Sequence, residues 1–441
     1  MVRRAGEAHE VVIEAIGARG DGIARRGGAR IFVPLTLPGD RLRVRIVGRR
    51  GDGLVGEVLE RLEEAPRTRP PCPHFGACGG CQLQHLPAAQ YRTWKREQVA
   101  AALAKRGLPD VAIEPLECTP PGARRRARLA FERRGAAVRL GFRARSGHRV
   151  IALRACPVLA PALVALLPPL RALLAGLDLA RRGGEVEATA SATGVDLLIL
   201  APHRPSLADR EALAAFAETH DLARISWAPG GDADGEPIAQ RRLPGVIFDE
   251  VRVGLPAGAF LQATAAAEGA LRRAVDDAIG DAGRIADLFA GCGTFGLPLA
   301  AAGRTVHAIE HDPAMLEALQ EAARRAGLEG RLTTERRDLQ RAPLAGAELE
   351  RFDAAVLDPP RAGARAQAAA FAASQVARLA MVSCYPATFA RDARLLADGG
   401  YGCLWVRPVD AFLWSGRIEL VAAFARDPAL TPRTRAAPRR P

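Results

Sequence analysis

Short apolar runs alternate with helical segments over the carboxyl-terminal half of this 441-residue chain, and no other feature restricts the fold as much. The runs cover residues 284–289, 305–310, 352–358 and 378–384. Runs of this length that are separated by helices are typical of a mostly parallel β-sheet with helices on both faces. We therefore expect residues 255–426 to form an α/β domain of the Rossmann-like type.

A glycine-rich turn follows the first of these runs. It begins after Asp287 and carries the pattern G-x-G-x-x-G at Gly291, Gly293 and Gly296. Glycines let the backbone approach a ligand closely at the carboxyl edge of such a sheet. The next run ends in Glu310, which is well placed to accept hydrogen bonds from ribose hydroxyls, and Asp338 follows a further candidate strand. The sequence predicts a nucleotide-type cofactor, and the glycines alone leave a dinucleotide open.

Two motifs stand at the ends of the later runs. Asp358-Pro-Pro-Arg361 is rigid and suits a projection that holds a flat base beside the cofactor; the alternative is an ordinary proline-rich turn. Ser383-Cys384-Tyr385-Pro386 places a thiol at a strand end, where a lone cysteine is more often a small buried apolar residue than a nucleophile. Glu419 lies in a strand near the carboxyl end, and its position alone indicates no function.

Residues 1–62 have the pattern of a small β domain. Strand-like segments at 11–16, 29–34, 40–47 and 54–59 are separated by glycine-rich turns. One of them alternates apolar residues with Arg41, Arg43 and Arg45, so one face of the strand is basic and the other faces a core. A five-stranded, OB-like β-barrel with a basic face suits oligonucleotide binding, and a plain solvated face is an equally good interpretation.

The formal net charge of +13 is carried by arginine, because Lys95 and Lys105 are the only lysines. A surplus of this size favours a polyanionic partner, since phosphate contacts release counterions. Residues 122–149 hold ten arginines and one acidic residue in an alternation typical of hairpin strands, which a genome-wide arginine bias does not explain. We expect a nucleic-acid surface there, with phosphate contacts from Arg124, Arg126, Arg128, Arg143 and Arg145.

Three of the eight cysteines, Cys72, Cys78 and Cys81, lie within ten positions on a loop rich in proline and glycine. Such clustering in a cytoplasmic chain favours a metal site over disulfides. A fourth thiolate has to come from elsewhere, and Cys156 is a better candidate than Cys118. Four thiolates fit either zinc or an iron–sulfur cluster, and their spacing does not decide between the two.

No targeting or membrane-spanning segment is expected. The amino terminus lacks an apolar stretch, and the most apolar window, residues 162–177, is interrupted by prolines and an arginine. We expect a cytoplasmic monomer that makes no membrane contact. Its expected parts are residues 1–62, a central α+β domain at 63–254 that carries the cysteine loop, the α/β domain at 255–426 and a disordered tail at 427–441.

The motifs occur in an order that resembles the RNA uracil-C5 methyltransferase family. They are Phe260-Leu-Gln262, the turn at Asp287, Asp358-Pro-Pro-Arg361, Ser383-Cys384-x-Pro386 and Ile418-Glu419. The amino-terminal stretch resembles a TRAM domain, an OB-like RNA-binding module. The cysteine loop resembles the [4Fe-4S] loop of the family's iron–sulfur members. The resemblance covers nearly the whole chain and implies S-adenosylmethionine as methyl donor, RNA as partner and a cluster on Cys72, Cys78, Cys81 and Cys156.

The resemblance also implies roles for single residues. Carbon 5 of uracil is a poor nucleophile, and addition of a thiolate at carbon 6 makes carbon 5 reactive; a base then removes the carbon 5 proton. Cys384 is the implied nucleophile and Glu419 the implied base, and Asp358 lies at the reacting base. The implied cofactor contacts are Gln262, Phe289, Gly291, Thr294, Glu310, Asp338 and Asp358.

Three positions depart from the family pattern. Tyr385 stands where Asn is usual, Thr264 where Asn is common, and Gly416-Arg417 where Pro-His is frequent. The first two concern substrate contacts, and the third concerns the base. We expect 23S rRNA as the target, with tRNA as the alternative. A non-catalytic iron–sulfur RNA-binding protein and an NAD-dependent oxidoreductase are the competing classes, and the latter leaves Asp358-Pro-Pro-Arg361 unexplained.

Overall fold

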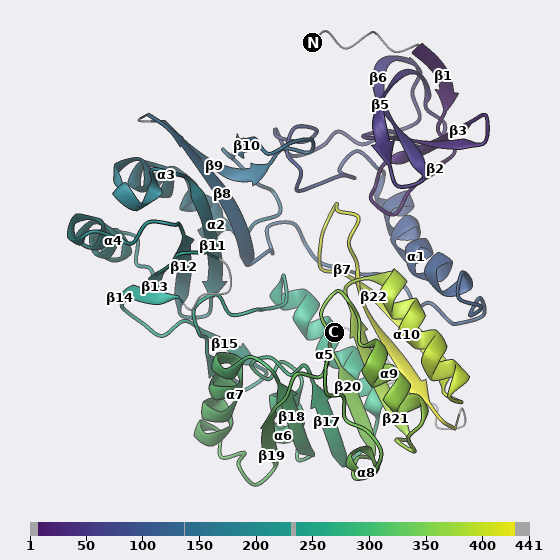
Figure 1. Cartoon of the computed structure of the whole chain (residues 1–441), viewed down its shortest axis with the longest axis vertical. Helices are drawn as coiled ribbons and strands as arrows, with labels where there is room; N and C mark the ends of the chain where they lie inside the picture. The colour runs from purple at the N-terminus through teal and green to yellow at the C-terminus, as the bar shows by residue number, and fades with distance from the viewer. Residues whose placement is uncertain (1–7, 136, 231–234, 428–441) are drawn as a thin grey trace, which may run out of the picture.

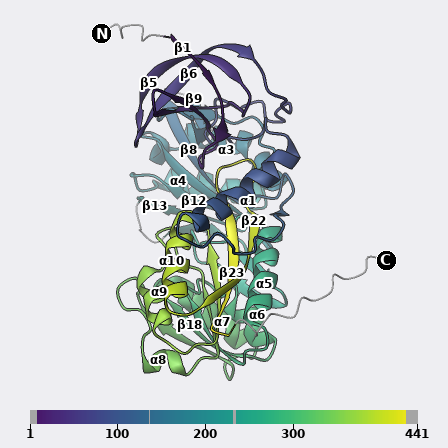
Figure 2. The same cartoon turned by 90° about the vertical axis from the view of Figure 1, so that its right-hand side faces the viewer.

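The structure is a computed structural model and describes residues 8–135, 137–230 and 235–427. Within them the strands form three large sheets and one two-stranded hairpin, β15 (Gly245–Phe248) with β16 (Val251–Gly254). Figure 1 shows the amino-terminal sheet at the top, the central sheet at the upper left and the carboxyl-terminal sheet at the bottom. The turned view in Figure 2 shows the same succession along the long axis. The tail expected at 427–441 lies outside the described residues except for Asp427.

The amino-terminal sheet has the strand order β1-β5-β6-β4-β3-β2. Along β5 the fully buried Leu42 and Val44 alternate with the exposed Arg41 and Arg43, so the predicted period of two is confirmed there. The sheet has six strands among the described residues, whereas five were expected. They are β1 (Ala8–Val12), β2 (Ala15–Ile16), β3 (Gly22–Arg26), β4 (Ala29–Val33), β5 (Arg41–Arg50) and β6 (Gly53–Glu63).

The central sheet has the order β10-β9-β8-β11-β12-β13-β14, in which only β12 and β13 pair in parallel. The arginine-rich segment forms the hairpin of β8 and β9, as predicted. The strands are β8 (Arg126–Arg134), β9 (Ala137–Arg143), β10 (Val150–Ala152), β11 (Gly184–Ser191), β12 (Gly194–Leu200), β13 (Arg224–Ala228) and β14 (Glu236–Gln240). The helices that pack on them are α2 (Pro161–Ala165), α3 (Leu167–Gly176) and α4 (Leu207–Thr219).

The carboxyl-terminal sheet has the order β19-β18-β17-β20-β21-β23-β22-β7. Its first five strands are parallel, and β23 runs antiparallel to both of its neighbours. The strands are β17 (Arg284–Leu288), β18 (Thr305–Glu310), β19 (Leu332–Arg336), β20 (Ala354–Leu357), β21 (Arg378–Ser383), β22 (Gly402–Asp410) and β23 (Glu419–Ala425). The four runs read from the sequence are β17, β18, β20 and β21, so the predicted Rossmann-like sheet is confirmed.

Helices cover both faces of this sheet because neighbouring residues of each strand enter different cores. On β20, Ala354 and Val356 pack in the core of α5 (Ala265–Ile279), α6 (Gly296–Ala301) and α7 (Pro313–Arg325). Ala355 and Leu357 pack in the core of α9 (Arg365–Ala372), α10 (Pro386–Asp398) and the short α8 (Ala347–Glu350). A strand buried on both sides therefore reads as a continuous apolar run.

Two elements from the range expected for the central domain join the carboxyl-terminal sheet. Helix α1 (Ala88–Ala104) packs on α10 and β22 and contributes Val99 and Leu103 to the same core, and β7 (Glu117–Cys118) pairs in parallel with β22. Figure 1 shows α1 beside α10 at the right. None of the helices in the described ranges has the length and apolarity needed to cross a lipid bilayer.

Candidate active site

The predicted site residues gather at the carboxyl ends of the parallel strands. Neighbours of β17 in the sheet are β18 on one side and β20 on the other, so the strand order reverses there. In open α/β sheets, ligands bind in the crevice at such a switch point. The turn after β17, Glu310 at the end of β18, Asp358 after β20 and Cys384 after β21 all lie along this edge.

The turn after β17 has an unusual backbone that Glu310 holds in place. Phe289 has a φ of 63° and Gly291 a φ of 56°, and a bulky residue rarely adopts such a conformation unless its surroundings enforce it. The Gly291 N–H donates to Glu310 Oε2 at 2.8 Å, and the N–H groups of His311 and Asp312 donate to its Oε1. The Glu310 carboxylate is thus fixed against the glycine turn.

Two other predicted cofactor residues follow strands of the same sheet, and Asp287 ends the strand before the turn. Thr294 is half-buried just before α6, and Asp338 is half-buried after β19, where its Oδ1 accepts a hydrogen bond from the Gln340 N–H at 3.0 Å. Asp287 is fully buried, and its Oδ2 accepts from the Gly296 N–H at 2.8 Å. Burial raises the pKa of Asp287 to about 8. Asp287 therefore braces the start of α6.

Asp358 and Gln262 contact each other across the site. Gln262 comes from the segment before α5, is 4% exposed and donates from Nε2 to Asp358 Oδ2 at 3.1 Å. Burial raises the pKa of Asp358 to about 7, and the hydrogen bond from Gln262 opposes this rise. Two motifs that are 96 positions apart are thereby joined.

Strand pairing brings Glu419 to the level of Cys384. In the antiparallel pair of β21 and β23, Ser383 at the end of β21 lies opposite Leu420, so Cys384, which directly follows β21, comes to the level of Glu419. Glu419 is 4% exposed, and burial, with a further effect of the Asp358 charge, raises its pKa to about 8. Burial, together with the charges of Glu419 and Asp358, raises the pKa of the Cys384 thiol to about 11. The three groups therefore form one electrostatically coupled site.

Cys384 opens into a cleft of about 730 Å³ between distant parts of the chain. Its walls come from the β2–β3 turn, the cysteine loop, the end of α1 and the segment before β23. Five cationic residues line it: Arg19, Lys105, Arg106, Arg361 and Arg417. No acidic residue lines this cleft, and within the described ranges no salt bridge neutralises these five groups. The cleft next to the thiol therefore suits a polyanion.

The segment 411–418, which leads into Glu419, is anchored by α1. Lys95 and Asp410 are fully buried, and the Lys95 ammonium donates to Asp410 Oδ1 at 2.9 Å and to the Arg417 carbonyl. Tyr91 donates to Asp410 Oδ2 at 2.7 Å and accepts from the Trp414 N–H at 2.8 Å. The approach of the chain to Glu419 is therefore fixed by buried polar contacts.

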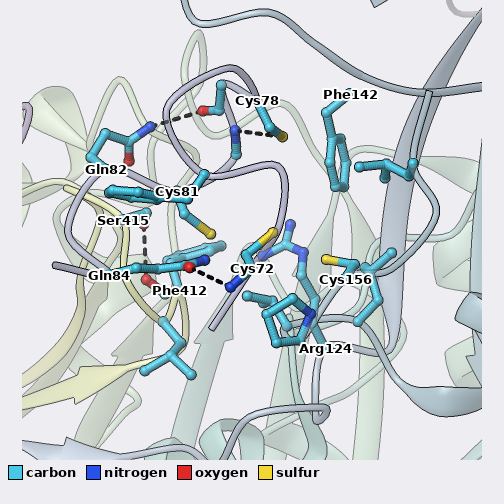
Figure 3. Close-up of a pocket in the computed structure, with 18 of the residues that line it drawn as sticks. Cys72, Cys78, Cys81, Gln82, Gln84, Arg124, Phe142, Cys156, Phe412 and Ser415 are labelled. Carbon is cyan, nitrogen blue, oxygen red and sulfur yellow. Dashed lines mark hydrogen bonds between the residues drawn. The ribbon is translucent and has the colours of Figure 1, made fainter. Parts of the chain in front are cut away.

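The cysteines of the loop lie around one cavity. Cys72, Cys78, Cys81 and Cys156 line a space of about 290 Å³, and Figure 3 shows the sulfur atoms of Cys72, Cys81 and Cys156 pointing into it. Cys118 lies elsewhere, exposed on β7. Within the described ranges, no group of three or more His, Cys, Asp or Glu side chains is arranged to hold a metal ion.

Most of the arginines that were expected to form a free nucleic-acid surface on β5, β8 and β9 are instead paired with acidic side chains. Arg126, Arg128 and Arg143 form salt bridges with glutamates of β11, while Arg124 and Arg145 lie at the cysteine cavity and loop. On β5, Arg41, Arg43 and Arg45 form salt bridges with glutamates of β1 and β6. Sequence reasoning missed the cationic cleft because its residues come from four distant segments and share no local pattern.

Three comparisons place this geometry among known proteins. No family model matches the chain. It is 43% identical over 427 residues to a Caulobacter vibrioides protein named an uncharacterized RNA methyltransferase, with coverage of 95% of this chain and 100% of that protein. It is 36% identical over 435 residues to the 23S rRNA (uracil(1939)-C(5))-methyltransferase RlmD of Chromohalobacter salexigens, with coverage of 96% and 90%.

Among solved structures, the chain is similar to the tRNA (uracil-54, C5)-methyltransferase of Pyrococcus abyssi in complex with S-adenosyl-L-homocysteine. The TM-score is 0.73, the identity is 21%, and the match covers 94% of this chain and 99% of that one. At this identity the likeness shows a shared fold. Together with the relatives that match over nearly its whole length, it shows that the chain belongs to the RNA uracil-C5 methyltransferase family.

Proposed function

We propose that the protein transfers a methyl group from S-adenosylmethionine to carbon 5 of a uridine in 23S rRNA. The observation that carries the proposal is the meeting of Cys384, Glu419 and Asp358 at the carboxyl edge of the sheet, next to a cleft lined by five unneutralised cations. A thiol, a carboxylate of raised pKa and a cationic cleft are the three parts that this chemistry requires.

Cys384 is the nucleophile in this proposal. Its sulfur adds to carbon 6 of the uracil, which places electron density on carbon 5. In the resting protein the raised pKa keeps the thiol protonated, so its proton has to pass to water in the cleft before the sulfur adds as a thiolate. The charge of Arg361, which also lines the cleft, opposes this rise in the pKa of Cys384 and so favours the thiolate.

Glu419 is the general base, and Asp358 positions the uracil. A pKa near 8 makes the Glu419 carboxylate a stronger proton acceptor than an ordinary one, as removal of the carbon 5 proton requires. When Glu419 has taken that proton, the electron pair left on carbon 5 forms the double bond between carbons 5 and 6, the bond between Cys384 and carbon 6 breaks, and Cys384 leaves as a thiolate. Asp358, held by Gln262, lies on the rigid Pro-Pro turn and is available to bind the polar edge of the base.

The turn after β17 fits S-adenosylmethionine, which supplies the methyl group when bound. Gly291 and Gly293 have positive φ angles, so they leave the backbone open at the sheet edge, and a Cβ on Gly293 would lie 2.6 Å from Leu297. Glu310 is fixed where ribose hydroxyls can donate to it. The residues proposed to hold the cofactor are Gln262, Phe289, Gly291, Thr294, Glu310, Asp338 and Asp358.

The cysteine cavity fits an iron–sulfur cluster better than a single ion. One zinc ion would hold its four sulfurs about 3.8 Å apart, given Zn–S bonds of about 2.3 Å. The four thiols instead line a common cavity of about 290 Å³, which is larger than a single ion needs. Phe75, Phe142 and Phe412 also enclose this cavity. The Gly80 N–H donates to Cys78 Sγ at 3.4 Å, a contact typical of cluster thiolates. We propose a [4Fe-4S] cluster on Cys72, Cys78, Cys81 and Cys156, with a structural role.

The proposed partner RNA enters the cleft between the amino-terminal sheet and the carboxyl-terminal domain. Arg19 of the β2–β3 turn lines the cleft, which gives this sheet a place in RNA binding of the kind that a TRAM module would have. The target 23S rRNA is favoured over tRNA because the relative from Chromohalobacter salexigens, which acts on uridine 1939 of 23S rRNA, matches 96% of the chain.

Methyl transfer to defined RNAs tests the proposal. The wild type should methylate a 23S rRNA hairpin around uridine 1939 and should form a covalent adduct when that uridine is 5-fluorouridine, because fluorine cannot leave as the proton does. Cys384→Ala should abolish both while leaving S-adenosylmethionine binding nearly unchanged. Cys118→Ala, which removes an exposed thiol outside the site, is the matched control. Full activity of Cys384→Ala would refute the mechanism, and labelling of tRNA alone would reassign the target.

A further inference from the structure

Tyr385, the residue after the nucleophile, has no part in the proposed chemistry. Its side chain is 38% exposed, and the residue lines the cleft next to Cys384. Its backbone is fixed at the start of α10, because its N–H donates to Ser383 Oγ at 3.2 Å. An exposed tyrosine ring in a cationic cleft is well suited to a flat partner.

Arg361 covers one face of the ring. Its guanidinium carbon lies 4.5 Å from the ring centroid of Tyr385. The Thr388 hydroxyl lies 3.1 Å from the backbone carbonyl oxygen of Arg361 and 3.2 Å from that of Tyr385, so it is within hydrogen-bond distance of each. The two side chains therefore form a supported pair, in which the arginine supplies charge to one face of a ring that remains 38% exposed.

The surrounding charges identify the kind of ligand. Among the described residues that line the cleft, five are cationic and none is acidic, so the cleft favours an anionic ligand. An exposed ring among such groups is the arrangement that binds unpaired bases of a nucleic acid. A target uridine must leave its stack to reach Cys384, which also deprives a neighbouring base of its stacking partner. A tyrosine can replace that partner, whereas the Asn usual at this position cannot.

We propose that the Tyr385 ring, backed by Arg361, stacks on the unpaired base next to the target uridine and thereby positions the uridine at Cys384. This inference rests on the proposed function. Tyr385 is a positioning residue, since it contacts neither the reacting carbon nor the methyl donor.

Binding of matched RNAs tests the contact. The probes are the hairpin around uridine 1939, intact or lacking the base on the 5′ or on the 3′ side of the target. On intact RNA, Tyr385→Ala should raise Kd by about 5- to 150-fold, which is the range of one base stacked on an aromatic ring. Tyr385→Phe keeps the ring and should restore most of the affinity. On one of the two abasic RNAs, wild type and Tyr385→Ala should bind equally.

Two controls keep the outcomes separate. S-adenosylmethionine affinity should be unchanged in both Tyr385 variants, and Leu207→Ala, which trims a 72% exposed side chain on α4, should bind RNA as the wild type does. Equal binding of intact RNA by wild type and Tyr385→Ala overturns the inference. The inference is also overturned if Tyr385→Ala weakens binding of both abasic RNAs as much as it weakens binding of the intact RNA. The ring would then act through the protein and not through a neighbouring base. Both results are measured by binding and do not need methyl transfer. A wild type that methylates no uridine would therefore contradict the proposed function and would leave the test of Tyr385 unaffected.

Discussion

Replacing Glu419 with Gln should make the Cys384 thiol more reactive at alkaline pH. The charge of Glu419 is, after burial, the largest cause that raises the pKa of Cys384 to about 11. Glutamine keeps the size of the side chain and removes the charge, so the pKa of the thiol should fall. The same substitution removes the proposed base, so methyl transfer should be lost while the nucleophile becomes more reactive.

The pH dependence follows from the pKa of Glu419 itself. With a pKa of about 8, this carboxyl is mostly neutral at pH 7 and mostly ionised at pH 9. The Glu419 carboxyl group disfavours the thiolate form of Cys384 only when it is ionised and carries its negative charge. Wild type and Glu419→Gln should therefore react alike at pH 7, and the variant should become the faster of the two as pH rises through 8.

The size of the difference can be bounded. A thiol of pKa 9.0 is about one-tenth ionised at pH 8, and one of pKa about 11 is about one-thousandth ionised, so the whole shift suppresses the thiolate about 100-fold. Burial stays in the variant, so we expect at most about tenfold of this to be recovered, and only above about pH 9, where Glu419 of the wild type is mostly ionised. A thiolate of lower pKa is also a weaker nucleophile, which reduces a tenfold gain in thiolate to about a 3- to 4-fold gain in rate.

The assay is alkylation by iodoacetamide from about pH 6.5 to 9.5, with mass spectrometry of the peptide that contains Cys384. Reading this peptide separates Cys384 from the seven other cysteines. Glu317→Gln, which removes an exposed carboxylate on α7, should follow the wild type at every pH. A rate ratio that is flat across this range, or a slower Glu419→Gln, would refute the coupling between the two groups and with it the site as described.

Two further predictions concern the cysteines and the arginines. Cys156→Ser should lose the iron, sulfide and brown absorbance of anaerobically purified protein, whereas Cys118→Ser should keep them; zinc in the wild type would contradict the cluster. Changing Arg19, Arg106 and Arg417 together to Gln should flatten the plot of log affinity against log salt by ~0.7 to 0.9 for each phosphate that is no longer bound, as RNA titrations would measure. The same change at Arg126, Arg128 and Arg143 should flatten that slope less, because Glu185 and Glu187 already offset two of these three charges.

The sheet and its edge were predictable because they depend on local patterns. Each parallel strand is a continuous apolar run, and residues that directly follow such runs meet at one edge. This rule is sufficient to bring Glu310, Asp358 and Cys384 together. It could not place Glu419, because the position of that residue depends on an antiparallel register between β21 and β23, which no local pattern specifies.

The distribution of charge was not predictable, since it depends on which strands pair. The alternating arginines of β5 look like a free basic face in sequence, yet β6 places Glu57, Glu60 and Glu63 beside them. Exposed pairs of this kind add little stability, but they remove the charge that a phosphate would meet. In contrast, Arg19 and Arg417 are isolated in sequence and become part of one cationic cleft only through the fold.

Packing accounts for the departure from the family pattern just before the base. A Cβ on Gly416 would lie 2.8 Å from the Ala18 carbonyl oxygen, so only glycine lets the β2–β3 turn approach this closely. That contact brings Arg19 to the cleft, where Arg417 also lies, while the Arg417 carbonyl accepts a hydrogen bond from the buried Lys95. Glycine thus makes room for the amino-terminal sheet, and the arginine after it adds a cation to the wall of the cleft. Gly416 and Arg417, which depart from the family pattern just before Glu419, therefore connect the amino-terminal sheet to the carboxyl-terminal domain at the wall of the cleft.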